Sequence, residues 1–225
     1  MKIYAHRGFS GKYPEGSRTA YLKAADIGAD GVECDVRFTR DGTLICFHDA
    51  TTERITGKKG RVSRLTLAQM RERYELMTLE ELLDFVIKRK LNLLIETKHP
   101  VAAGRKVERE VLRLLKMREN EIKAAGIRVI VFTFSFWAAR FLAKRYDDAG
   151  YIVKRSWRIR FNPTKILALG YWLAKENPAL IHILKKYELF MWTLNTREDI
   201  ELAKKVGASA AITNFPDLAK EVLGR

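Results

Sequence analysis

The sequence has few cysteines, few prolines and no long apolar run. Only two of its 225 residues are cysteine, Cys34 and Cys46, too few for a disulfide framework and typical of a reducing compartment. No apolar stretch reaches the roughly 18 residues of a membrane-spanning helix. No apolar signal segment follows Met1, so we expect a cytoplasmic protein without a membrane span.

Acidic residues are also in deficit. There are 42 lysines and arginines against 27 aspartates and glutamates, which gives a net charge of +15. Such a balance favours an anionic partner, which phosphates, lipid headgroups or nucleic acid could each supply. The chain has no zinc-finger spacing, no arginine-rich arm and no helix with concentrated base-reading residues, so we expect no specific nucleic-acid binding.

Apolar segments recur along the whole length, with no linker, repeat or low-complexity stretch between them, so we expect one domain over residues 1–225. Strand-like segments are Lys2–His6, Gly31–Thr39, Leu91–Lys98, Arg128–Ser135, Tyr151–Val153, Leu189–Asn195 and Ala210–Asn214. Helical patterns are Ser17–Ile27, Thr78–Lys88, Val101–Lys123, Phe136–Tyr146, Arg197–Val206 and Pro216–Leu223. With an eighth strand near Trp157–Phe161, this alternation predicts a (β/α)8 TIM barrel. The structural rival is a doubly wound open sheet, but no glycine-rich dinucleotide loop follows the first strand.

In such a barrel the functional side chains lie where the strands end. The first strand ends in His6 and Arg7, and the second carries Glu33 and Asp35. Two carboxylates spaced by two on a strand share one face, and a divalent cation bound by hard oxygen ligands would relieve their repulsion. The sequence therefore predicts a metal site at Glu33 and Asp35 on the second strand, next to the first strand.

A hairpin after Asp35 is predicted to return a histidine to the acidic pair. Asp41-Gly42 lies between two β-rich runs and is typical of a two-residue turn. That turn would pair Asp35 with His48. Two imidazoles titrating near neutrality could then take and give a proton, while cationic Arg7 and Lys98 stabilise a charged phosphorus centre. Read on its own, the same cluster could be a set of salt bridges between core groups.

An ordered set of short motifs carries a family resemblance. These are His6-Arg7-Gly8, Pro14-Glu15, Gly28–Val36, Thr39–Gly42, His48-Asp49, Thr78–Leu82, Glu96-Thr97-Lys98, Trp192–Asn195 and Gly207…Ile212-Thr213. With these motifs in this order, the sequence resembles the glycerophosphodiester phosphodiesterase family. The resemblance implies a (β/α)8 barrel of the phospholipase C-like type that hydrolyses glycerophosphodiesters to glycerol 3-phosphate and an alcohol with Mg²⁺ or Ca²⁺.

The resemblance also implies roles for individual residues. His6 and His48 would be the general acid and base, in either order. Glu33, Asp35 and Glu96 would bind the metal. Substrate would be held by Arg7, Glu15 and Lys98. Apart from the resemblance, Trp192 could line the glycerol pocket, although aromatic residues inside barrel strands are often core residues. The chain departs from the family pattern at Gly16, where an asparagine is usual, and at Asn214, where an aspartate is usual.

Several alternatives stay open from sequence alone. A lysophospholipase D-like or phosphoinositide-type phosphodiesterase would use the same scaffold. A non-catalytic barrel that binds nucleic acid or membranes is the rival from another class. Lys154–Glu188 contains eight lysines or arginines against two glutamates, interleaved with aromatic residues. This composition suits peripheral contact with lipid headgroups, but a solvated basic surface is the simpler explanation.

Overall fold

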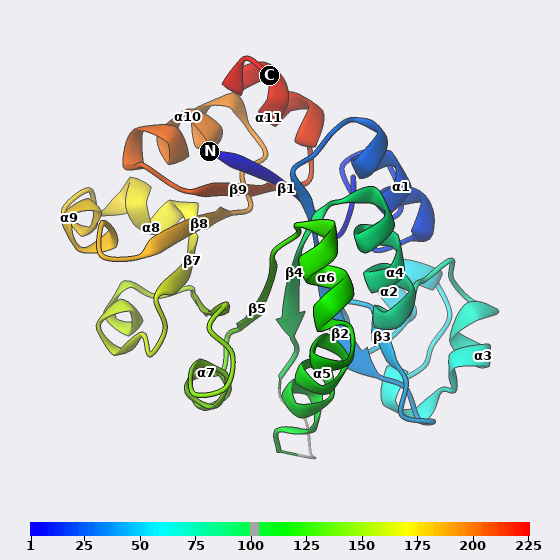
Figure 1. Cartoon of the computed structure of the whole chain (residues 1–225). Coiled ribbons are helices and arrows are strands. Elements are labelled where there is room, and N and C mark those ends of the chain that lie inside the picture. Colours follow the sequence, from blue (N-terminus) through cyan, green and yellow to red (C-terminus); the bar gives the residue numbers. More distant parts are fainter. Residues whose placement is uncertain (100–103) are drawn as a thin grey trace.

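A computed structural model describes residues 1–99 and 104–225, and its strands form a closed barrel (Figure 1). The strands are β1 (Lys2–His6), β2 (Gly31–Phe38), β3 (Leu44–Cys46), β4 (Asn92–Thr97), β5 (Val129–Thr133), β6 (Ala149–Val153), β7 (Ile166–Gly170), β8 (Glu188–Trp192) and β9 (Ala210–Thr213). They follow the order β1-β9-β8-β7-β6-β5-β4-β2-β3, and β1 also pairs with β2. All pairings except β2–β3 are parallel, so eight strands close the predicted (β/α)8 barrel and β3 is an antiparallel addition.

Helices surround the barrel and connect its strands (Figure 1). The α-helices are α1 (Arg18–Asp26), α2 (Glu53–Thr56), α3 (Leu67–Arg71), α4 (Leu79–Arg89), α5 (Lys106–Met117), α6 (Glu119–Ala125), α7 (Phe136–Ala143), α8 (Tyr171–Glu176), α9 (Leu180–Leu184), α10 (Arg197–Val206) and α11 (Pro216–Leu223). Two 3₁₀ turns are η1 (Val62–Arg64) and η2 (Ser156–Phe161). Among the described helices, five begin with a hydroxyl N-cap whose side chain accepts a backbone hydrogen bond, and these caps are Ser17, Thr66, Thr78, Ser135 and Thr196.

Two predicted elements differ from the structure. The helix expected over Val101–Lys123 is divided at Arg118 into α5 and α6, and its residues 101–103 lie outside the described part. The prediction of a strand near Trp157–Phe161 is wrong, because these residues form η2. The barrel strand that follows β6 is β7. The alternating pattern of the η2 segment mimics a half-buried strand. A parallel barrel strand is covered on both faces, so the continuous apolar run Ile166–Gly170 fills the position instead.

The hairpin register is also shifted by one residue from the prediction. Val36 pairs with Cys46 and Phe38 with Leu44, so Asp35 does not pair with His48. The Phe47 amide donates to the Asp35 carbonyl instead. The turn is longer than two residues, because the Gly42 amide donates to Thr39 O and Gly42 adopts a left-handed φ of 80°.

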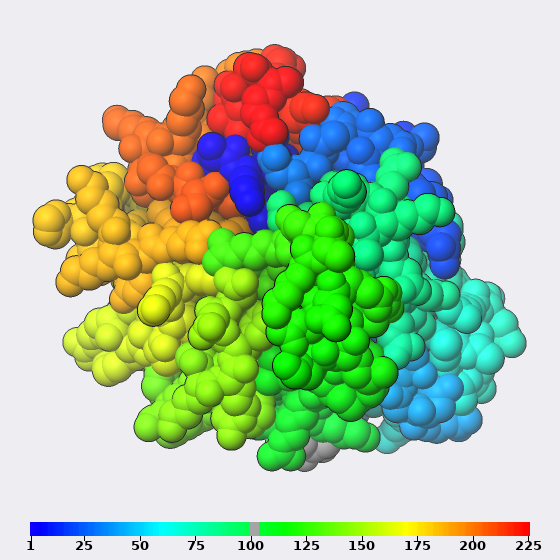
Figure 2. Space-filling view, viewed as in Figure 1, coloured from blue at the N-terminus to red at the C-terminus, as the bar shows by residue number. Residues whose placement is uncertain are grey.

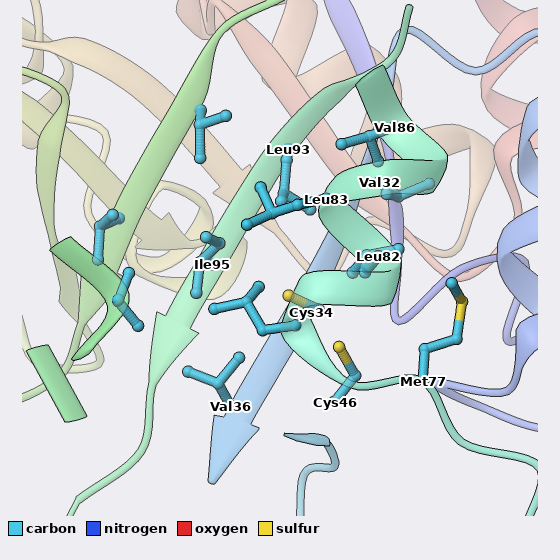
Figure 3. Close-up of a cluster of buried hydrophobic side chains, with 14 of the residues drawn as sticks. Val32, Cys34, Val36, Cys46, Met77, Leu82, Leu83, Val86, Leu93 and Ile95 are labelled. Atoms are coloured by element: carbon cyan, nitrogen blue, oxygen red, sulfur yellow. The ribbon is translucent and has the colours of Figure 1, made fainter. Parts of the chain in front are cut away.

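The core lies in two shells, one inside the barrel and one between strands and helices. Figure 3 shows the outer shell where α4 covers β2 and β4, with Leu82, Leu83 and Val86 against Val32 and Ile95. Both cysteines are free and buried in this cluster. The inner shell is made of alternating strand residues, namely Tyr4, Leu94, Ile130, Phe132, Ile152, Ile166, Ala168, Phe190, Ala210 and Ile212. These apolar side chains fill the barrel below the positions where the polar strand ends begin.

The barrel has a mouth at the C-terminal ends of its strands and a closed face at the other end. In Figure 1 the arrows of β2 and β4 point toward the lower part of the view, and both chain ends lie at the top. Figure 2 shows the segment after β3, with α2 and α3, as the cyan right flank of the molecule. In the described residues, no helix has the length and apolar character needed to cross a membrane.

Candidate active site

A pocket of about 140 Å³ opens at the mouth of the barrel. It is lined on its polar side by side chains from four strand ends or the residues just after them, and these are His6, Arg7, Glu33, His48, Glu96 and Lys98. The carboxylates of Glu33 and Glu96 face the pocket because inward positions alternate along β2 and β4. Apolar strand segments thus bring together charged groups that are far apart in the sequence.

Three carboxylates and two cations form a polar cluster at this pocket, in which Asp35 lies just behind the lining residues. Oxygen atoms of Glu33, Asp35 and Glu96 all lie within 4.8 Å of one another. Lys98 Nζ lies 2.7 Å from Asp35 Oδ1 and 2.5 Å from Glu96 Oε1. Arg7 Nε lies 2.9 Å from Asp35 Oδ2. The structure therefore contains both the acidic cluster and the salt bridges that the sequence left as alternatives.

These carboxylates cannot all ionise easily. Burial and the neighbouring Asp35 charge raise the pKa of Glu33 well above its ordinary range, and the same two causes raise the pKa of Glu96 to about 7. Burial alone would raise the pKa of Asp35, but Lys98 and Arg7 lower it to about 2. The cluster thus holds more acid groups than its two cations neutralise, and a further cation would relieve this excess.

The donor set fits a divalent cation. Arg7 and Lys98 form ion pairs with the two oxygens of Asp35, and Lys98 also contacts Glu96, so two cations are shared among three buried carboxylates. A buried carboxylate that exceeds the available positive charge is costly to ionise unless a further cation binds it. Three carboxylates in a polar pocket are the ligands that Mg²⁺ and Ca²⁺ prefer. Glu33, Asp35 and Glu96 could therefore hold such an ion.

His6 is held at the end of β1 by a neutral partner. Its Nδ1 lies 2.7 Å from Asn214 Oδ1, which also accepts a bond from Ser10 Oγ. The acceptor fixes the proton on Nδ1 and leaves the Nε2 lone pair free. Nε2 lies 3.9 Å from Glu33 Oε2. Burial, assisted by Arg7, lowers the pKa of His6 to about 4, so this imidazole is neutral at physiological pH.

His48 reaches the same pocket from the loop after β3 and has a charged partner. Its Nδ1 donates to Asp49 Oδ1 at 2.6 Å, and Arg54 Nε donates to the other oxygen of Asp49 at 2.6 Å. Burial lowers the pKa of His48, while the charge of Asp35 and the hydrogen bond with Asp49 oppose this effect. The loop, rather than ladder pairing, positions this side chain, since pairing in β3 ends at Cys46.

Arg7 is fixed from both backbone and side chain. Its φ of 56° is a left-handed conformation that only a few per cent of residues other than glycine adopt. The conformation directs its amide to Glu33 Oε2 at 3.0 Å, and its Nη1 donates to Glu15 Oε1 at 3.0 Å. Glu15 also accepts two bonds from Arg54. Glu15 thus contacts Arg7 at the edge of the pocket, and Arg54 connects it to the partner of His48.

The opposite wall of the pocket is apolar and carries one further cation. Trp192, Phe134, Ile152 and Ile212 lie along it. Lys154 Nζ lies 4.5 Å from the centre of the Phe134 ring and 5.6 Å from that of Trp192. The sequence prediction missed Lys154 and the supporting roles of Asn214 and Asp49. The position of Asp49 directly after His48 could have indicated its role. Lys154 could have been found because it directly follows β6.

Comparisons with known proteins agree on one family. The family model described as the glycerophosphoryl diester phosphodiesterase family matches residues 6–218. A Mycobacterium tuberculosis protein named "Probable glycerophosphodiester phosphodiesterase 1" is 33% identical, with 97% of this chain and 90% of that protein covered.

Solved structures agree with the fold. An Oleispira antarctica phosphodiesterase in complex with the product sn-glycerol-3-phosphate has a TM-score of 0.85 at 19% identity, covering 100% of this chain and 97% of that one. A Thermotoga maritima glycerophosphodiester phosphodiesterase has a TM-score of 0.81 at 26% identity, covering 99% of this chain and 97% of that one. The fold of this chain is therefore shared over nearly its whole length with these solved structures.

Proposed function

Because the chain belongs to the glycerophosphoryl diester phosphodiesterase family, we propose that it hydrolyses glycerophosphodiesters to glycerol 3-phosphate and an alcohol in the pocket at the barrel mouth. One observation carries the proposal beyond the family name. Two imidazoles, the carboxylates of Glu33 and Glu96 and the cations of Arg7 and Lys98 line a single pocket, although they come from distant parts of the chain. Asp35 lies against this lining, with an oxygen within 4.8 Å of the other two carboxylates.

We assign the base to His6 and the acid to His48. His6 is neutral at physiological pH and its Nε2 lone pair is free, so it can take the proton of the attacking hydroxyl, whether from water or from the substrate glycerol. His48 is held by the Asp49 carboxylate, which stabilises the protonated imidazole. It can give that proton to the oxygen of the departing alcohol as the phosphorus–oxygen bond breaks. Arg7 and Lys98 face the charge that develops on the phosphoryl oxygens.

We propose that Glu33, Asp35 and Glu96 bind the divalent cation, which would supply further positive charge to the phosphoryl oxygens. Adding Mg²⁺ or Ca²⁺ to chelator-treated protein is expected to raise its melting temperature, because binding to the folded state alone is stabilising. Glu96→Gln should abolish most of this shift while the protein stays folded. Equal shifts in wild type and Glu96→Gln would contradict the assignment without any measurement of activity.

The test of the reaction is glycerol 3-phosphate release from glycerophosphocholine with Mg²⁺, Ca²⁺ or chelator. His6→Ala and His48→Ala should each lower kcat by about 10²–10⁴-fold, the usual contribution of a general acid or base. His182→Ala is the matched control, because His182 is an exposed residue of α9. Full activity of the His6 and His48 variants would contradict the two-histidine mechanism.

The apolar wall favours a second candidate substrate. Trp192, Phe134 and Ile152 offer a surface that an acyl chain could contact, as a lysophospholipase D-like or phosphoinositide-type activity would require. A comparison of kcat/KM for glycerophosphocholine and lysophosphatidylcholine distinguishes the two. A higher value for the lysophospholipid would identify the apolar wall as an acyl site, and a higher value for the short diester would restrict it to the glycerol.

A further inference from the structure

A second feature at the barrel mouth lies outside the pocket. Residues 149–175 contain six lysines or arginines and no acidic residue. This segment includes η2, and η2 presents two large exposed side chains, Trp157 at 54% and Phe161 at 48% exposure. The adjacent start of α7 adds Trp137 at 64% exposure. Exposed aromatic residues grouped in this way mark an interaction surface more often than single ones do.

The aromatic and basic side chains of η2 are interleaved. The Trp157 and Phe161 rings pack edge to face at 6.1 Å. The Arg158 guanidinium lies 5.6 Å from the centre of the Trp157 ring, and that of Arg160 lies 4.6 Å from the centre of the Phe161 ring. Across the described residues, Arg155, Arg158 and Arg160 make no salt bridge, so their charges are uncompensated.

A shallow hollow joins η2 to α7. It has a volume of about 310 Å³ and is lined by Phe136, Trp137, Tyr151, Trp157, Arg158 and Phe161. In Figure 1 the turn is the yellow-green coil next to α7. We call the side chains of Trp137, Arg155, Trp157, Arg158, Arg160 and Phe161 the basic–aromatic rim.

The rim lies on the same side of the molecule as the active-site pocket. α7 follows β5 and η2 follows β6, and these two strands are neighbours whose C-terminal ends form part of the mouth. Lys154 connects the two features, because it lines the pocket and is followed directly by Arg155. A surface bound at the rim would therefore face the entrance of the pocket.

We propose that the basic–aromatic rim binds the surface of an anionic phospholipid bilayer. Indole and phenyl rings beside guanidinium groups suit the headgroup region, where rings lie among the apolar parts and cations contact phosphates. Nucleic acid fits less well, because a bound strand needs a basic groove that follows its backbone. The rim is instead a compact patch whose hollow is walled mainly by apolar rings. The proposal does not depend on the proposed function, since binding needs no hydrolysis.

Co-sedimentation of the whole protein with vesicles, in the presence of chelator, tests this surface. Wild type should pellet with vesicles of phosphatidylcholine and phosphatidylglycerol, less with phosphatidylcholine alone, and less at high salt. The triple variant Arg155→Gln, Arg158→Gln, Arg160→Gln should partition onto anionic vesicles roughly 100-fold more weakly, since each basic residue near such a surface contributes about five-fold.

The control removes the same charge from the opposite face. Lys2, Lys204 and Lys205 are exposed at the start of β1 and the end of α10, away from the mouth. The triple variant Lys2→Gln, Lys204→Gln, Lys205→Gln should pellet nearly as wild type does. Equal losses in the two triple variants would overturn the proposal, because net charge alone would then explain binding. Absence of wild-type pelleting would overturn it too.

Aromatic contact is tested separately. The double variant Trp157→Ala, Phe161→Ala should bind anionic vesicles more weakly than wild type at equal net charge, and unchanged binding would overturn the role of the rings. If the rim bound single-stranded DNA more tightly than it bound anionic vesicles, the choice of lipid would be overturned. Hydrolysis of soluble glycerophosphocholine by all these variants would show that they fold. If the wild-type protein did not hydrolyse this substrate, the proposed function would be contradicted, while the binding result would stand.

Discussion

The two histidines of the pocket have chemically different partners. Asn214 offers His6 a neutral amide oxygen, whereas Asp49 offers His48 a carboxylate. A neutral partner orients an imidazole without stabilising its protonated form, and a charged partner does both. The different partners are the reason for which we propose His6 as the base and His48 as the acid.

Replacement of Asn214 tests the orientation of His6. Asn214→Leu removes the oxygen that fixes the proton on Nδ1, so we expect kcat to fall about 10-fold to 100-fold, less than after loss of the imidazole itself. Asn214→Asp keeps an acceptor and should retain far more activity. Steady-state kinetics with glycerophosphocholine measure both. If the two variants lose activity equally, the hydrogen bond to His6 is not what matters at this position.

The strand-end residues of the pocket were predictable, whereas their partners were not. His6, Glu33 and Glu96 follow from the rule that barrel chemistry lies at strand C-terminal ends. Asn214 contacts His6 only because β9 pairs with β1, which closes the barrel across 208 residues of sequence. Contacts of this kind depend on closure and register, and no local pattern encodes them.

At the scale of elements, α4 is fixed to the barrel by its apolar face. Leu79, Leu82, Leu83 and Val86 are fully buried against β2 and β4. Its N-terminus has a complete capping box, in which Thr78 Oγ1 accepts from the Glu81 amide and Glu81 accepts from the Thr78 amide. Since β2 carries Glu33 and Asp35, this packing also holds two of the acidic residues in place.

Truncation in this cluster should destabilise the fold. Leu83→Ala leaves a cavity between α4 and the strands and is expected to lower the free energy of unfolding by about 2–5 kcal/mol. Chemical denaturation followed by circular dichroism measures this change. Lys88→Ala, at an exposed position of the same helix, should change it by less than about 0.5 kcal/mol. Similar effects of the two substitutions would contradict the burial of Leu83 as the cause.

Element prediction succeeded for the capped helix α4 and failed for β7 and at the division between α5 and α6. α4 has both an apolar stripe and a capping sequence, and its predicted position is correct. β7 is five apolar residues, a run that periodicity cannot assign to strand or helix. The hairpin register failed for a related reason, since one residue more in the turn shifts every pair.

At the scale of the whole molecule, Asp30 fastens the closed face of the barrel. Its Oδ2 accepts from the Ile3 amide at 2.8 Å and from Arg225 Nη1 at 2.6 Å, and its Oδ1 accepts from Arg225 Nη2 at 2.9 Å. One side chain thus connects β1, the start of β2 and Arg225, the second residue after α11.

The pH dependence of this contact has a definite sign. Burial alone would raise the pKa of Asp30, but the bonds from Arg225 and Ile3 hold it below its ordinary value of 3.8. The contact therefore stabilises the fold in full above that value and is lost as pH falls through the lower folded-state value. Asp30→Asn should cost about 1 kcal/mol at neutral pH, and this cost should shrink in acid below the ordinary value. Urea denaturation of wild type and Asp30→Asn at neutral pH and at a pH below 3.8 measures this difference in the free energy of unfolding. A difference that grows in acid would contradict the prediction.

The position of the chain ends has a practical consequence. Met1 precedes β1, and Arg225 is bound to Asp30, so residues 1 and 225 both lie on the closed face, opposite the pocket and the basic–aromatic rim (Figure 1). A bead, a reporter domain or a linker that joins the two ends would be attached at the back of the enzyme. Immobilised through either end, the protein would present its mouth to the solution, and a circular permutant would keep every side chain of the pocket in place.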